Sequence, residues 1–118
     1  MDTDNILSNK ILNKISTYAK ENENQEICGV LVKIDDSFEF IKCENLAKNK
    51  KVYFEIDPCV FVDYNIQVIV HSHCMGSAKP STDDKKCSDS IDMPFLIYSV
   101  LHDNFCLYDN KSVTQFKV

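Results

Sequence analysis

Residues 66–84 read Ile66-Gln-Val-Ile-Val-His-Ser-His-Cys-Met-Gly-Ser-Ala-Lys-Pro-Ser-Thr-Asp-Asp84, and the rest of the chain is organised around them. The β-formers at 66–70 predict a strand that delivers His71 and His73 at its end. Residues two apart in an extended chain point to the same side, so both imidazoles leave the strand in one direction. Two imidazoles and a carboxylate can hold one zinc ion and leave a coordination position open. The stretch therefore predicts a zinc site of the hydrolytic kind.

The carboxylate ligand lies in the segment after the strand. Asp84 is the candidate and its neighbour Asp83 is the alternative. Cys74 could bind the metal or be oxidised, or it could simply be a small loop residue. A satisfied pair of histidines at a strand end is the structural alternative for His71 and His73. Their spacing and the following Ser-x-x-Asp favour a metal.

Two further residues could supply the chemistry that a metal site lacks. Hydrolysis of an amide needs a group that takes the proton of the attacking water and passes it to the leaving amine. Glu26, just before a predicted strand, is the best upstream candidate. The hydroxyl of Ser81 could donate to the oxyanion that forms on the substrate carbonyl. Ser81 could equally cap a helix, with Asp84 as its capping-box partner, and both interpretations stay open.

The remaining chain predicts a mixed sheet with helices packed on it, an α/β layered architecture in one domain. An apolar stripe predicts a long helix over 4–20, capped by Asp4, and the segment from Ser81 to 92–94 predicts a shorter one. Gly29, inside a strand, marks a close backbone approach or a bulge. The expected strands are 27–34, 38–43, 52–56, 66–70, 95–101, 104–108 and 113–118, with one or two helical turns over 59–64.

Composition excludes several classes of protein. With a net charge of −5 and 26% charged residues, the 118-residue chain has no electrostatic footprint for nucleic acid. No apolar run approaches the ~20 residues that span a bilayer, and the acidic amino terminus is unlike a signal peptide. The six cysteines form no Cys-x-x-Cys pair. We therefore expect a cytoplasmic protein, with mostly buried thiols and a surface His102.

The motif resembles that of the JAMM (MPN-plus) zinc metalloproteases: an upstream Glu, His-x-His, seven residues, then Ser-x-x-Asp. The resemblance covers roughly residues 5 to 110. It implies a deaminase-like mixed sheet flanked by helices and Zn²⁺ as the cofactor. It also implies peptide or isopeptide hydrolysis. By the same match His71, His73 and Asp84 would bind zinc, Glu26 would be the acid/base and Ser81 the oxyanion donor.

Within that family the chain is most similar to the amino-terminal domain of phage tail assembly proteins of the K type. The likeness rests on Asn45-Leu-Ala47, Phe54, Cys87 and Pro94-Phe95. It departs from the family at Cys74, where proline usually follows the second histidine. Many tail proteins continue into a cysteine peptidase domain, and none of the six cysteines here has the downstream histidine that such a domain needs. The implied substrate is a tail protein, or the tail of a ubiquitin-like or sulfur-carrier protein. A phage-encoded copy would work in the host cytoplasm or in the virion.

Two other functions compete with a peptidase. A structural or assembly module could use the same fold without hydrolysis, although the residues of the motif are all present. A zinc nucleobase deaminase would need His-x-Glu and Pro-Cys-x-x-Cys, and the sequence contains neither.

Overall fold

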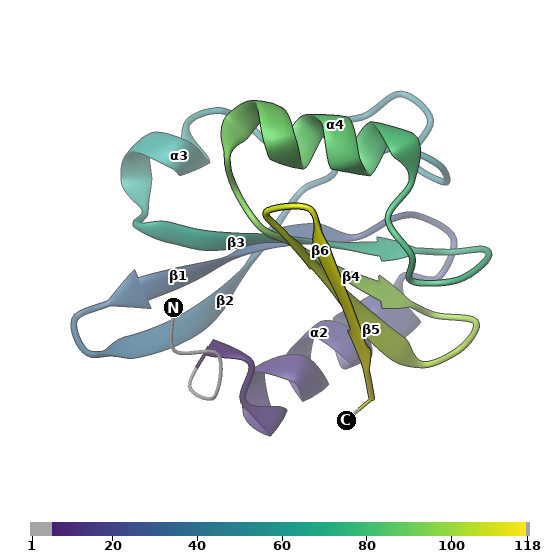
Figure 1. Cartoon of the computed structure of the whole chain (residues 1–118), viewed down its shortest axis with the longest axis horizontal. Coiled ribbons are helices and arrows are strands. Elements are labelled where there is room, and N and C mark those ends of the chain that lie inside the picture. The colour runs from purple at the N-terminus through teal and green to yellow at the C-terminus, as the bar shows by residue number, and fades with distance from the viewer. Residues whose placement is uncertain (1–5, 118) are drawn as a thin grey trace.

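The computed structural model describes residues 6–117, which fold around one six-stranded mixed sheet in the order β2-β1-β3-β4-β5-β6 (Figure 1). Only β3 and β4 pair in parallel; the other neighbours along the sheet are antiparallel. In this part of the chain the strands are β1 (Cys28–Ile34), β2 (Ser37–Cys43), β3 (Ile66–His73), β4 (Phe95–Ser99), β5 (Asn104–Asp109) and β6 (Ser112–Phe116), and the helices are α2 (Asn9–Glu21), α3 (Val60–Asp63) and α4 (Thr82–Ile91). The predicted α/β class is confirmed.

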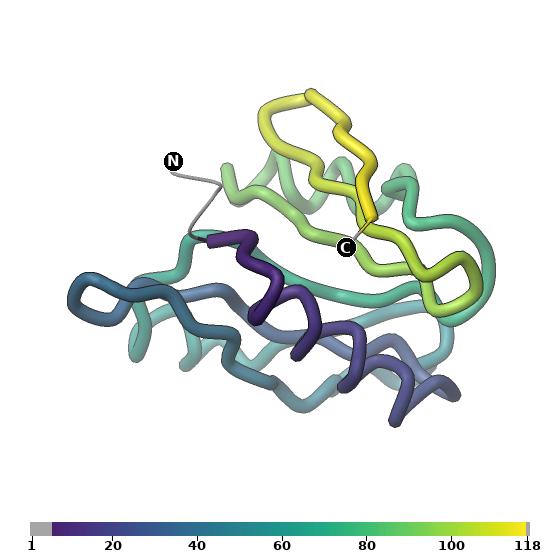
Figure 2. Tube along the Cα trace, turned by 90° about the horizontal axis from the view of Figure 1, so that it is seen from below, coloured from purple at the N-terminus to yellow at the C-terminus, as the bar shows by residue number. Residues whose placement is uncertain are grey.

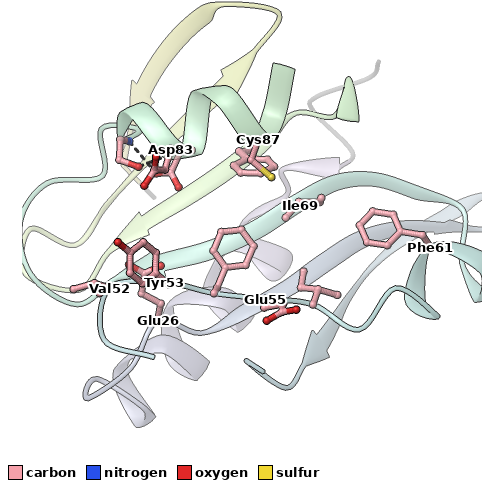
Figure 3. A pocket seen from close by; sticks show the side chains of 13 residues that line it. Glu26, Val52, Tyr53, Glu55, Phe61, Ile69, Asp83 and Cys87 are labelled. Carbon is pink, nitrogen blue, oxygen red and sulfur yellow. Dashed lines mark hydrogen bonds between the residues drawn. The ribbon is translucent and has the colours of Figure 1, made fainter. Parts of the chain in front are cut away.

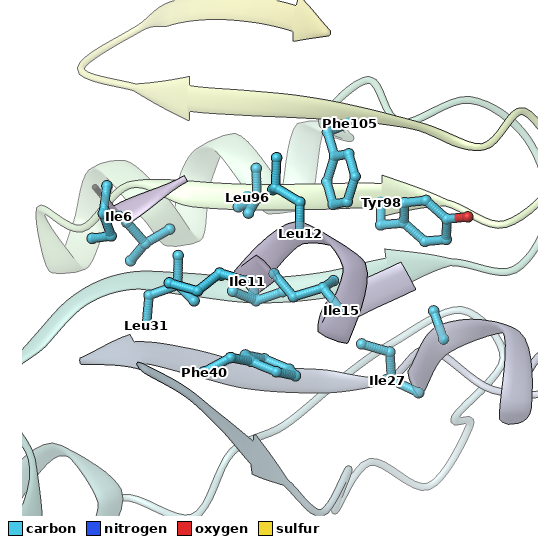
Figure 4. Packing of buried hydrophobic residues seen from close by; sticks show 13 residues of the cluster. Ile6, Ile11, Leu12, Ile15, Ile27, Leu31, Phe40, Leu96, Tyr98 and Phe105 are labelled. Carbon is cyan, nitrogen blue, oxygen red and sulfur yellow. The ribbon is translucent and has the colours of Figure 1, made fainter. Parts of the chain in front are cut away.

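The sheet lies between two helical layers. Helix α2 crosses one face, and α3 and α4 lie over the other (Figures 1 and 2). Alternation along β3 divides its side chains between these layers: Val68 and Val70 join the core under α2, and Ile69 joins the core under α4. By the same alternation His71 and His73 face the α4 side. Figure 4 shows the α2 side, where Ile11 and Ile15 pack on Leu31 and Phe40.

The first helix begins later than its apolar stripe suggests. Helix α2 starts at Asn9, and the Ser8 side chain caps it by accepting a hydrogen bond from the Ile11 N–H at 3.3 Å. The predicted single helix over 4–20 is therefore wrong, because the chain leaves helical geometry at residues 7–8. Its expected start at residue 4 and the predicted Asp4 cap lie outside the described residues.

The predicted strand 52–56 is also wrong. This segment is extended, but no strand among the described residues 6–117 pairs with it. The Asn45 side chain instead donates to the Tyr53 carbonyl and accepts from the Glu55 N–H. The Leu46 N–H donates to the Glu55 carbonyl. An amide side chain can replace a neighbouring strand in this way because it carries both donors and acceptors.

Gly29 occupies the close approach that its position in a strand suggests. A β-carbon there would lie 2.5 Å from the Ile41 carbonyl oxygen of β2 and 2.5 Å from the Phe40 ring. No side chain larger than hydrogen fits, so this glycine lets β1 and β2 pair over the ring.

Three smaller expectations concern the surface. His102 is exposed, as predicted. The cysteines are less buried than expected: Cys28 and Cys106 are buried, and the other four are partly or fully exposed. The predicted mostly buried thiols are therefore wrong, because the other four lie at a strand end, in loops or, for Cys87, on the side of α4 that lines an open cavity. No helix in residues 6–117 is long and apolar enough to cross a membrane.

Candidate metal centre

The connection from β3 to α4 brings two imidazoles and one carboxylate together. β3 ends at His73, the loop 74–80 turns the chain back, and α4 begins at Thr82. One ligand atom from each of His71, His73 and Asp84 lies within 4.8 Å of the other two. The geometry therefore unites the three residues that the sequence suggested as ligands.

Asp84 occupies this position because it also starts the helix. Its backbone N–H donates to Ser81 Oγ at 3.0 Å, and its carboxylate Oδ2 accepts from the Ser81 N–H at 2.9 Å, which is a capping box. Asp83, the alternative ligand, is exposed and does not belong to the group. Cys74 is half-buried and lies outside the group as well.

The protonation of His73 shows that this group fits a cation. Its Nδ1 lies 2.7 Å from the Ser77 carbonyl oxygen, and a carbonyl oxygen only accepts. The ring proton of a neutral His73 therefore sits on Nδ1, and the Nε2 lone pair faces the Asp84 carboxylate at 3.1 Å. Two acceptors at this distance need a positive charge between them.

His71 gives a second sign of the same fit. It is fully buried, and neither ring nitrogen makes a well-formed hydrogen bond with any group in residues 6–117. Its Nε2 is nevertheless 3.1 Å from Asp84 Oδ1. An unsatisfied buried nitrogen is costly unless something binds it. Two imidazoles and a carboxylate are the donor set of a zinc site with an open position.

The electrostatics of the three residues differ. Burial lowers the pKa of His71. Burial also acts to lower the pKa of His73, but its bonds to Asp84 and to the Ser77 carbonyl outweigh burial and raise it. Burial would raise the pKa of Asp84, yet its contacts with the two imidazoles hold that pKa well below its usual range. The carboxylate is therefore ionised in the folded protein, as a metal ligand must be.

Glu26 lies beside this group, from a position far upstream in the chain. Its side chain is 7% exposed, and it lines the same cavity as Asp84 and Ser81. Burial raises the pKa of Glu26 to about 7, with attraction by His73 lowering it and repulsion by Asp84 raising it. A carboxyl group with a pKa near 7 can both take and give a proton at neutral pH.

Sequence reasoning missed Ser72, which binds the backbone of Ile27, the residue next to Glu26. The side chain of Ser72 points to the face opposite the imidazoles, and its Oγ accepts from the Ile27 N–H at 2.9 Å. Its own N–H donates to the Ile27 carbonyl at 3.0 Å. The signal was the small polar residue between two histidines in a strand buried on both faces.

Phe54 completes the surroundings of His71. Its ring stacks on the imidazole with centroids 4.3 Å apart and planes at 18°, while Phe95 meets the same imidazole edge-on at 5.6 Å. The sequence marked Phe54 only through a family likeness and gave no sign of this contact.

A cavity of about 320 Å³ leads away from the group between the extended segment 52–56 and helix α4. Figure 3 shows Glu26, Tyr53 and Asp83 towards one end and Phe61 at the other. Ile69 and Phe95 belong to its floor of apolar side chains. The centre thus opens into an apolar cleft, where extended chain could lie.

A mixed sheet between helices, with a His-x-His strand end facing a capped helix, defines a JAB/MPN-type domain. The chain belongs to the prokaryotic homologues of the JAB domain, whose family model matches residues 8–110. A comparison with curated proteins found no match.

Solved structures agree on the fold. The solution structure of a Desulfitobacterium hafniense protein is 20% identical with a TM-score of 0.67, over 92% of this chain and 87% of that one. A JAB1/MPN domain protein from Archaeoglobus fulgidus is 20% identical with a TM-score of 0.61, over 92% of this chain and 93% of that one. A Salinibacter ruber protein is 15% identical with a TM-score of 0.51, over 94% and 80%.

Proposed function

We propose that the protein is a zinc-dependent peptidase or isopeptidase. One observation carries this proposal: a buried carboxyl group with a pKa of about 7, Glu26, lies beside three ligand atoms that converge within 4.8 Å. A purely structural zinc site closes its coordination with a fourth protein ligand and needs no adjacent base.

Each residue has a defined part in the reaction. His71, His73 and Asp84 would hold the zinc ion, which when bound would make hydroxide available from water near neutral pH and would polarise a carbonyl. Glu26 takes the proton of the attacking water and passes it to the leaving amine. Its buried position favours this cycle, because the neutral and charged forms are close in energy near pH 7.

Ser81 can hold its capping role and donate to the substrate at once. Its oxygen accepts the Asp84 N–H, and this bond leaves the hydroxyl proton free. Ser81 is exposed and lines the cavity, so that proton can reach the carbonyl oxygen on which negative charge develops.

The cleft supports an extended peptide as the substrate. In segment 53–56 the Tyr53 carbonyl and both Glu55 backbone groups bind Asn45 or Leu46, and the Tyr53 N–H donates to the Asn49 carbonyl. Backbone groups alternate sides in extended chain, so those of Phe54 and Ile56 face the other way. Within residues 6–117 no hydrogen bond satisfies them. A substrate strand can pair with this edge and place an apolar side chain on the cavity floor.

The test uses Glu26→Gln, with Glu44→Gln as the matched control because Glu44 is exposed. Zinc-loaded proteins are incubated with a mixed peptide library, and new amino termini are read by mass spectrometry. We expect the wild type and the control to cut next to apolar residues. Glu26→Gln should keep stoichiometric zinc and lose at least about 100-fold in rate. Full activity of Glu26→Gln would overturn the assignment of the base.

Metal content separates this function from a non-catalytic assembly module. The protein is purified without chelators and its metal is measured by mass spectrometry. One zinc per chain is expected, and His71→Ala should lose it. A metal-free wild type that also fails to bind added zinc would favour the assembly module.

A further inference from the structure

The side chain of Asn45 has a complete set of buried hydrogen bonds. Its Nδ2 donates to the Glu26 carbonyl at 2.8 Å and to the Tyr53 carbonyl at 2.9 Å. Its Oδ1 accepts from the N–H groups of Ala47 at 3.0 Å and Glu55 at 3.1 Å. An asparagine amide offers two donor hydrogens and two acceptor lone pairs, so no capacity is left over. Two carbonyls on one side and two N–H groups on the other also fix the orientation of the amide.

The first of these bonds restrains the backbone from which the Glu26 side chain leaves. The Glu26 N–H donates to the Lys50 carbonyl at 2.6 Å, and the next N–H, of Ile27, donates to Ser72 Oγ. The Ser72 N–H donates to the Ile27 carbonyl, so the bond from Asn45 to the Glu26 carbonyl is the fourth restraint on the same two residues. Together they fix where the Glu26 carboxyl group enters the cavity.

Two more of these bonds restrain Phe54 from both sides. Asn45 binds the carbonyl of Tyr53 and the N–H of Glu55, the residues immediately before and after Phe54. In the described part of the chain no strand pairs with this segment, so the amide takes the place of a sheet neighbour. The Phe54 ring that it holds lies flat on the His71 imidazole at 4.3 Å.

His71 needs such a support more than His73 does. A metal-binding histidine is usually oriented by a hydrogen bond from its other ring nitrogen. His73 has one, from Nδ1 to the Ser77 carbonyl. The Nδ1 of His71 has none within residues 6–117, so its ring is oriented by aromatic contact.

We propose that Asn45 is a positioning residue for the centre: one amide sets the orientation of His71, through Phe54, and the placement of Glu26, through its carbonyl. This inference rests on the proposed function. It assigns a role to Asn45, which is neither a candidate metal ligand nor the proposed base. The base and one ligand come from distant parts of the chain, and this amide makes their positions interdependent.

The competing explanation is that Asn45 only stabilises the fold. Loss of buried hydrogen bonds lowers stability in either case, so the midpoint of thermal unfolding cannot separate the two. The orientation of the His71 ring can. Protons that lie over an aromatic ring are shielded, so stacking on Phe54 moves the His71 ring resonances upfield in the metal-free protein. A residue that only stabilises the fold would leave these resonances unchanged.

Three single variants and the double variant of Asn45→Asp with Phe54→Leu make the test. Asn45→Asp keeps the shape and the two accepted bonds but loses the donors to Glu26 and Tyr53. Phe54→Leu keeps the bonds of Asn45 and removes the stacked ring. The control is Ser88→Ala, because Ser88 is also buried and loses one hydrogen bond, to the Met93 carbonyl, away from the cavity.

Each variant is measured by histidine NMR without metal and by Co²⁺ titration, neither of which needs a substrate. We expect Asn45→Asp and Phe54→Leu to move the His71 resonances downfield. Both should also weaken Co²⁺ binding about 10- to 100-fold, the usual effect of losing an outer-shell partner. Ser88→Ala should change neither. The double variant should bind Co²⁺ almost as well as whichever single variant binds it less tightly. Both substitutions act on Co²⁺ binding through the same contact, that of the Phe54 ring with His71.

Wild-type His71 resonances and wild-type Co²⁺ affinity in Asn45→Asp would overturn the proposal. If Asn45→Asp does not fold, unchanged His71 resonances in Phe54→Leu would overturn it equally. The variants could show these effects while the wild-type protein binds Co²⁺ but cuts no peptide. That result would overturn the proposed function and leave the role of Asn45 intact.

Discussion

Ser81 and Asp84 exchange two hydrogen bonds across the first turn of α4, at 2.9 and 3.0 Å. The carboxylate in this exchange also lies 3.1 Å from an imidazole nitrogen of each histidine. The start of a helix and the negative charge of the centre therefore depend on one side chain. Removal of this side chain would therefore affect both.

Asp84→Asn separates the charge from the cap. The amide oxygen of asparagine can still accept the Ser81 N–H, so we expect the helix to form. Loss of the charged ligand should weaken Co²⁺ binding by more than the roughly 100-fold cost of an outer-shell change. Asp83→Asn is the matched control, since Asp83 is exposed and adjacent. Equal losses in both variants, measured by absorbance titration, would argue against Asp84 as the ligand.

Ser81 can be tested for its two roles with two substitutions. Ser81→Ala should lower the free energy of unfolding by about 1 kcal/mol, whereas Ser81→Gly should cost only a few tenths. Both remove the hydroxyl, so both should reduce kcat about 100- to 1,000-fold if it stabilises the oxyanion. Urea unfolding and peptide turnover provide the two measurements. Activity that follows stability, high in the glycine variant and low in the alanine variant, would leave Ser81 as a cap alone.

The raised pKa of Glu26 predicts that the free energy of unfolding of the metal-free protein falls as the pH rises towards 7. Its pKa rises from the ordinary value of 4.5 to about 7 on folding, so the folded state keeps a proton that the unfolded chain releases. This contribution is complete below pH 4.5 and is lost as the pH rises to 7. Glu26→Gln cannot ionise, so it should be more stable than the wild type by roughly 3 kcal/mol at pH 8 and about 1 kcal/mol at pH 5.

Urea unfolding of the chelator-treated wild type and Glu26→Gln at pH 5 and pH 8 measures this difference in the free energy of unfolding. Glu44→Gln is the control and should follow the wild type throughout. A constant difference between Glu26→Gln and the wild type would show that the carboxyl group titrates normally.

Gly29→Ala tests the contact between β1 and β2. The added β-carbon would meet both the Ile41 carbonyl and the Phe40 ring at 2.5 Å. We expect a loss of about 1–3 kcal/mol in the free energy of unfolding, as for other overpacked cores. Phe40→Leu in the same chain should recover part of the loss, because the ring yields and the backbone oxygen does not. An unchanged urea midpoint in Gly29→Ala would show that the strands can separate there.

Local signals in the sequence predicted the centre well. The spacing of His71 and His73 placed both imidazoles on one face of β3, because alternation along a strand leaves no other choice. The Ser-x-x-Asp pattern predicted the capping box of α4 for a similarly local reason. Their meeting in space depended on the turn at 74–80, which the sequence marked with glycine and proline.

Contacts between distant segments explain what the sequence did not predict. The pattern at 52–56 is that of a strand, but the Asn45 side chain, and not a neighbouring strand, binds the backbone of Tyr53 and Glu55. No local sequence signal identifies Asn45 as that partner. Ser72 likewise acts on Ile27, forty-five residues away. The apolar stripe of α2 was recognised, whereas its start was not, because Leu7 packs on the core from outside the helix.

The pairing of β1 with β3 places Cys28 opposite His71. If β3 slid by one residue, Ser72 would take the place of the imidazoles, and both histidines would turn towards α2. A chain with its strands paired in that way could fold and yet bind no metal. Because an ion that binds one form shifts the population towards it, metal present during folding would select chains with the correct register.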